Sequence, residues 1–134
     1  MSIVLYQLPT GNDASVYLAS ASADLSSSWD ASAVPYTQPT DTPLIGDESV
    51  WFVNVYDTAY EATAYVRTGH YVARIIWQQN LPKAIKPDAK EIPTAQEQLL
   101  PGIEFTAQAQ IQCIEDGGCS GITKLGKDLL PTLT

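Results

Sequence analysis

The amino-acid sequence predicts an all-β domain made of two similar four-stranded halves. Two observations lead to this fold class. Apolar and polar residues alternate with a period of two in several segments, as strands with one buried and one wet face require. One segment also occurs twice, because Asp13 to Ser20 matches Glu61 to Thr68 in residue type at nearly every position. Two copies of a β motif are expected to pair and bury a shared core.

The predicted strands are rich in β-branched and aromatic residues. The clearest is Ile103 to Cys113, where every second residue is apolar and is therefore expected to point inward. A short strand is expected near Asp24 to Ser26. The remaining strands are Ser2 to Tyr6, Ala14 to Ala19, Ala33 to Thr37, Val50 to Tyr56, Ala62 to Arg67 and Tyr71 to Trp77.

The alternating pattern lapses between Gln78 and Gly102, where prolines interrupt any regular element. Within this stretch Thr94 to Leu100 is typical of a short helix, with Thr94 as its cap and Glu97 three residues later. The chain beyond Gly121 shows little periodicity and is expected to form an extended or frayed tail. Turn chemistry is evident at Thr68-Gly69-His70.

The second half of the chain resembles a Greek key of the βγ-crystallin superfamily. Trp51 to Tyr71 is similar to that family's aromatic strand, folded hairpin and Gly-x-Tyr return, and Ile3 to Tyr6 with Trp29-Asp30 corresponds to parts of the other motif. The resemblance implies one β-sandwich domain of two Greek keys covering residues 1–134. It places the first key at about 1–45, the second at about 48–113 with an inserted loop at 78–102, and a tail at 114–134.

Many members of that superfamily bind calcium through paired acidic or amide residues followed by hydroxyl residues, which offer oxygen ligands to a hard cation. The corresponding stretch here, Trp29 to Val34, retains Asp30 and Ser32 as remnants of the motif. The resemblance therefore implies a degenerate, non-functional calcium site, with weak calcium binding left open and no other cofactor or metal expected.

The charge of the chain excludes some partners. The net charge of −8 comes from 15 acidic and 7 basic residues, and residues 1–66 contain no Lys or Arg. An acidic surface repels phosphate backbones and anionic lipids, so we expect no nucleic-acid or membrane partner. The acidic half is either a cation-attracting face or a solvated surface that keeps a monomer soluble.

Targeting segments and cysteines in the sequence bear on the compartment of the protein and on its redox state. No basic segment with a following apolar stretch opens the chain, and no apolar run approaches the ~20 residues that a membrane span needs. We therefore expect a cytoplasmic protein. Cys113 and Cys119 would form a disulfide in an oxidising compartment and remain thiols in a reducing one.

The sequence contains no recognisable catalytic motif, and its sole histidine, His70, stands in a predicted turn beside Gly69. We therefore predict a protein that is not an enzyme. The resemblance is greatest to single-domain microbial members such as fruiting-body proteins of filamentous fungi, which implies a structural, storage or protective role. A calcium-binding module and a defence protein, such as a protease inhibitor or antimicrobial protein, are the alternatives.

The degenerate calcium motif predicts that the melting temperature shifts by less than about one degree between millimolar calcium and EDTA, because a ligand that does not bind the native state cannot stabilise it. Differential scanning calorimetry measures this shift. A rise of several degrees in calcium would favour the calcium-binding alternative over the structural role.

Overall fold

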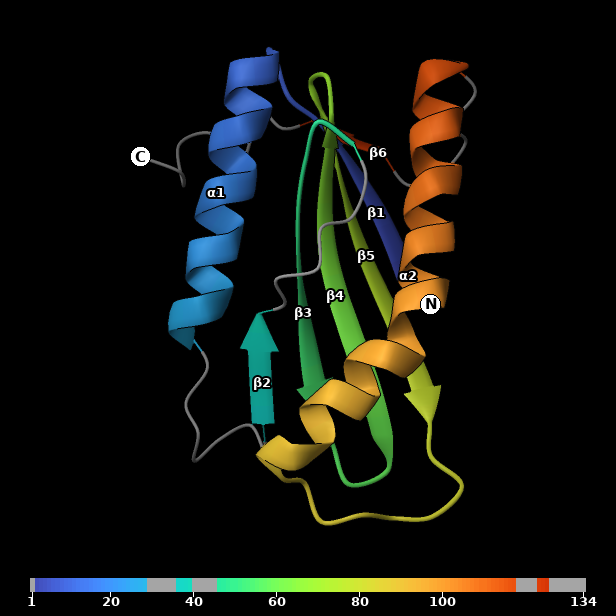
Figure 1. Cartoon of the computed structure of the whole chain (residues 1–134). Coiled ribbons are helices and arrows are strands. Elements are labelled where there is room, and N and C mark those ends of the chain that lie inside the picture. Colours follow the sequence, from blue (N-terminus) through green and yellow to red (C-terminus); the bar gives the residue numbers. More distant parts are fainter. Residues whose placement is uncertain (1, 29–35, 40–45, 118–122, 126–134) are drawn as a thin grey trace.

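Helices pack on both faces of a six-stranded sheet in the computed structural model, which describes residues 2–28, 36–39, 46–117 and 123–125 (Figure 1). In chain order the elements are strand β1 (Ser2–Gln7), helix α1 (Gly11–Ser28), strands β2 (Tyr36–Pro39), β3 (Glu48–Val55), β4 (Ala59–Thr68) and β5 (Tyr71–Asn80), the 3-10 helix η1 (Ala89–Glu91), helix α2 (Ile92–Glu115) and strand β6 (Thr123–Leu125).

The strands lie in the order β2-β3-β4-β5-β1-β6. All neighbouring pairs are antiparallel except β1 and β6, which run parallel. The β4–β5 turn contains Gly69 with φ +61°, a left-handed conformation that glycine adopts without steric cost and that suits a tight hairpin. The turn predicted at Thr68-Gly69-His70 is therefore confirmed.

The antiparallel β core is the part of the predicted fold that the structure confirms. The strands predicted near residues 2–6, 50–56, 62–67 and 71–77 correspond to β1, β3, β4 and β5, and the end of the 33–37 strand overlaps β2. The short helix predicted at Thr94 to Leu100 is also present, as part of the longer helix α2. Consequently the region predicted as an inserted loop, 78–102, contains the end of β5, η1 and the first half of α2.

The prediction that Ile103 to Cys113 is a strand was wrong, because this segment forms the second half of α2. Its buried residues include Ile103, Ala107 and Gln110, which recur at helical spacing, whereas Phe105 is 72% exposed. The alternating pattern is filled by Ala, Glu and Gln, which favour helix over strand. The helix propensity of these residues and the apolar face that the helix buries therefore outweigh the alternation of apolar and polar residues in the segment.

The prediction that Ala14 to Ala19 is a strand was also wrong, since these residues belong to α1. Thr10 caps this helix by accepting a hydrogen bond at its Oγ1 from the backbone N–H of Asp13 at 3.1 Å. The repeated segments are thus a helix in one copy and strand β4 in the other, so Tyr17 and Tyr65 are not equivalent. The fold is mixed α and β, rather than an all-β sandwich of two Greek keys.

Two separate apolar clusters fix the helices on the sheet. One cluster lies between α2 and one face, where Leu99 and Ile103 pack on Trp51, Val53 and Ile75. Each such buried side chain contributes about 1.5–3 kcal/mol. The second cluster lies between α1 and the opposite face, and it consists of Val4, Tyr6, Leu8, Ala14, Leu18, Tyr65 and Val72.

Helix α2 changes direction partway along its length (Figure 1) and contains Pro101 in its interior. Proline lacks the N–H that would bond to the carbonyl four residues earlier, which is a common cause of such bends. The next residue, Gly102, lies against Trp77 of β5. A Cβ added to Gly102 would approach the indole ring to 2.5 Å, so the absence of a side chain there allows the helix to reach the sheet.

We predict that Gly102→Ala lowers the free energy of unfolding by about 1–3 kcal/mol through overpacking, although alanine favours helix over glycine by about 1 kcal/mol. Urea unfolding measures the change. In a Trp77→Leu background the same substitution should become neutral or stabilising. An equal loss of unfolding free energy in both backgrounds would show that the contact with Trp77 does not cause the destabilisation by Gly102→Ala.

Candidate functional site

Most of the site residues predicted from sequence cannot be compared with the fold. Asp30, Ser32 and Cys119 lie outside the residues that the structure describes. Within the described ranges, no group of three or more His, Cys, Asp or Glu side chains is arranged to hold a metal ion. Cys113 lies in the last turn of α2 and is disulfide-bonded, which corresponds to the oxidised alternative.

His70 connects the β4–β5 turn to the end of β1. Its Nδ1 lies 2.8 Å from the carbonyl oxygen of Leu8, and the backbone N–H of Leu8 donates to the carbonyl of His70 at 2.8 Å. Because the ring nitrogen is engaged with the backbone, this histidine supports the structure of the turn.

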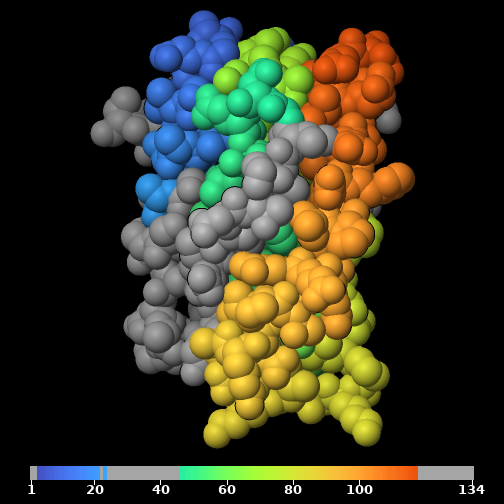
Figure 2. All heavy atoms as spheres, in the orientation of Figure 1, coloured from blue at the N-terminus to red at the C-terminus, as the bar shows by residue number. Residues whose placement is uncertain are grey.

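A pocket opens between the second half of α2 and the strands β1 and β5. It has a volume of about 300 Å³ and is open to solvent on one side. Its described lining consists of Ile3, Trp77, Phe105, Thr106, Ala109 and Gln110. Figure 2 shows the residues of α2 along one side of the molecule, with α1 along the other.

The pocket follows from the local structure of α2. The bend at Pro101 and the close approach at Gly102 hold the helix against Trp77, while the next turns pass over Ile3. The hydroxyl of Thr106 donates to the carbonyl of Gly102 at 2.8 Å, so this group is used within the helix. The pocket wall is therefore mainly apolar, with a largely exposed aromatic ring, Phe105, beside it.

The pocket cannot be predicted from the sequence, because it depends on the helical structure of residues 103–113. With Ile103 to Cys113 read as a strand, Phe105 was expected on the buried face beside Ile103. In the helix these residues point in different directions, and Phe105 is exposed while Ile103 is fully buried. Trp77, the last residue of the strand predicted at Tyr71 to Trp77, packs against the α2 cluster and also lines the pocket. Phe105 indicates an exposed aromatic site only once the segment is known to be helical.

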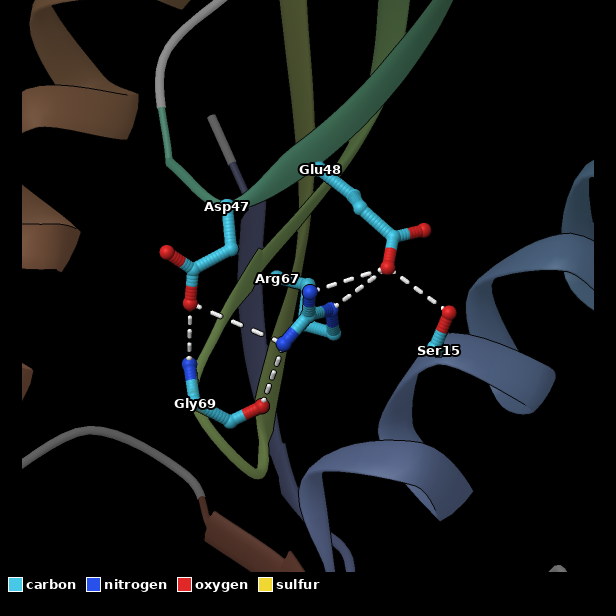
Figure 3. A network of polar contacts seen from close by, with 5 residues as sticks. All are labelled: Ser15, Asp47, Glu48, Arg67 and Gly69. Atoms are coloured by element: carbon cyan, nitrogen blue, oxygen red, sulfur yellow. Dashed lines mark hydrogen bonds and ion pairs between the residues drawn. The ribbon is translucent and has the colours of Figure 1, made fainter.

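A network of charged and polar groups at the other side of the sheet connects α1 to strands β3 and β4 (Figure 3). Glu48 accepts hydrogen bonds at Oε1 from the hydroxyl of Ser15 at 2.7 Å and from Nε of Arg67 at 2.9 Å. Asp47 accepts from the backbone N–H of Gly69 at 2.8 Å and lies 3.6 Å from Arg67. Every named acceptor here has a donor, so the network holds the elements together.

The network lowers the pKa of Glu48 below its usual value of 4.5. The hydrogen bond from Ser15 is the largest cause, and the hydrogen bond and charge of Arg67 add to it, while desolvation opposes them. A carboxyl group whose pKa is lower in the folded state stabilises the fold above its unfolded pKa. That stabilisation is lost as the pH falls through the lowered pKa. Its size is modest, below about 1 kcal/mol, because the side chain is partly exposed.

A group of tyrosines covers part of the α1 face. The rings of Tyr6 and Tyr17 lie 5.1 Å apart. Burial raises the pKa of Tyr17 well above its usual value of 10, and the neighbouring Tyr6 and Tyr65 raise it further, whereas Arg74 opposes the shift. Tyr17 is therefore neutral at physiological pH and belongs to the packing of α1 on the sheet.

No family model, curated protein or solved structure matches the chain. None of the helices in the described ranges is long and apolar enough to cross a membrane. The pocket under α2 is the candidate site because it is a concave and mainly apolar surface.

We predict that Ser15→Ala lowers the free energy of unfolding at pH 7 by about 0.5–1 kcal/mol, because Glu48 loses the hydrogen bond that lowers its pKa most. The loss should shrink at a second, acidic pH below the lowered pKa of Glu48, where this carboxyl group is protonated. Urea unfolding at both pH values measures this, with Ser20→Ala on the same helix as the control. An equal loss at both pH values would contradict the role of Glu48.

Proposed function

We propose that this chain is a non-catalytic binding protein that holds a small, mainly apolar molecule in the pocket under α2. The observation that carries the proposal is the pocket itself, with its volume of about 300 Å³ and a lining dominated by Ile3, Trp77, Phe105 and Ala109. Small-molecule sites are typically concave and mostly apolar, with volumes of roughly 300–1,000 Å³.

The volume limits the ligand. It corresponds to the space of roughly ten water molecules, so it suits a molecule of about ten to fifteen non-hydrogen atoms. Trp77 and Phe105 offer aromatic surfaces, which pack well against flat rings. With usual ligand efficiencies, such a molecule would bind with a Kd of roughly 10 μM to 1 mM.

The hypotheses derived from the sequence alone are separate from this proposal. The storage, calcium-binding and defence roles remain predictions, since no contact among the described residues bears on them. The resemblance to the βγ-crystallin superfamily does not support this proposal, because residues 14–19 and 103–113, which correspond to strands in that comparison, are helical.

We expect Ala109→Trp to weaken the binding of naphthylmethanol, a neutral probe of suitable size, at least tenfold. Ala109 is exposed at the pocket, so a large side chain there should occupy the ligand volume without disturbing the core. Isothermal titration calorimetry measures the affinity. Ala19→Trp introduces the same side chain at an exposed position of α1 and should leave binding unchanged.

Urea unfolding of both variants would verify that the fold is retained. The proposal would be overturned if the unmodified protein did not bind the probe at millimolar concentration, or if the two variants bound it equally.

A further inference from the structure

The six described side chains that line the pocket carry no formal charge. Of the elements that form it, β1 has no charged residue and β5 has only Arg74. Strand alternation places Arg74 on the face of α1, opposite to Trp77 and Ile75. Consistent with this position, the charge of Arg74 acts on Tyr17 of α1.

Helix α2 contributes only negative charge. It contains Glu97, Glu104 and Glu115 and no Lys or Arg. Asp116 follows the helix and lies seven residues beyond Ala109, so it continues the same side of the helix about 10 Å further along the axis. A ligand carboxylate would therefore find no cation on the α2 side of these elements, whereas a ligand ammonium would be attracted by the helix and by the net charge of −8.

The aromatic lining adds a second reason. Phe105 is 72% exposed beside the pocket, and Trp77 lines its wall. The faces of aromatic rings carry partial negative charge and attract cations, with tryptophan the strongest. A charged group at the open side could thus approach a ring face while remaining hydrated, and the apolar body of the ligand would lie inside.

We propose that the pocket selects aromatic amines, with the ring system between Trp77 and Ile3 and the ammonium group at the open side near Phe105. This inference rests on the proposed binding function and specifies the class of its ligand.

The experiment compares three probes that share one ring system and differ in charge. They are naphthylmethylamine, which is protonated at pH 7, the neutral naphthylmethanol, and the anionic naphthoate. Isothermal titration calorimetry at low ionic strength should show the amine binding about tenfold more tightly than the carboxylate, with the alcohol between them. The difference should narrow in 0.5 M salt, because salt screens charges near the surface.

The outcomes separate the two levels of the proposal. If none of the probes bound, the binding function itself would fall. If the alcohol bound but the carboxylate bound as tightly as the amine, the preference for amines would be overturned and the pocket would remain a neutral apolar site.

A charge-reversal variant tests whether the preference for amines over carboxylates originates near the pocket. Asp116→Lys should reduce the ratio between amine and carboxylate affinity by about threefold, because it places a positive charge on the same side of α2 as the pocket. Asp57→Lys makes the same change in charge in the exposed β3–β4 turn and should leave the ratio nearly unaltered. Equal effects of the two variants would contradict a local origin.

Discussion

The structure depends on the burial of both faces of its sheet. Strands β3 to β5 carry apolar side chains on both sides, so neither face can be left in water without a large hydrophobic cost. Helix α2 covers one face and α1 covers the other, each with its own apolar cluster. The two-sided arrangement explains why residues such as Ala62 to Val66 form a nearly continuous buried run rather than a clean alternation.

The two helices meet this requirement in different ways. The buried face of α1 presents small residues, Ala14 and Ala21, together with Leu18, and its position is further secured by the hydrogen bond from Ser15 to Glu48. The longer helix α2 contains Pro101 and bends over the sheet, with Gly102 in close contact with Trp77. Its C-terminal half covers the β1 side incompletely, and the pocket lies in that gap. The candidate site is therefore a consequence of how α2 is fitted to the sheet.

The charged residues also differ between the two faces of the sheet. Arg67 and Arg74 both belong to the α1 face, where Arg67 holds Asp47 and Glu48 together and Arg74 lies near Tyr17. The α2 side of the sheet has an apolar pocket and a helix whose charged residues are all acidic. The two faces consequently offer different chemistry, one a closed structural network and the other an open apolar cavity in a negative field.

The sequence by itself determined the strands β1, β3, β4 and β5, the turn at Gly69 and the negative net charge, because β-branched and aromatic residues, turn glycines and carboxylates act locally. It did not determine whether residues 14–19 and 103–113 were strands or helices. Their apolar residues satisfy both periods in part, and only packing against the two faces of the sheet selects the helical one. Tertiary structure alone also decided the pocket, since Ile3, Trp77 and Phe105 are distant in the chain and meet only when α2 packs on β5 beside β1.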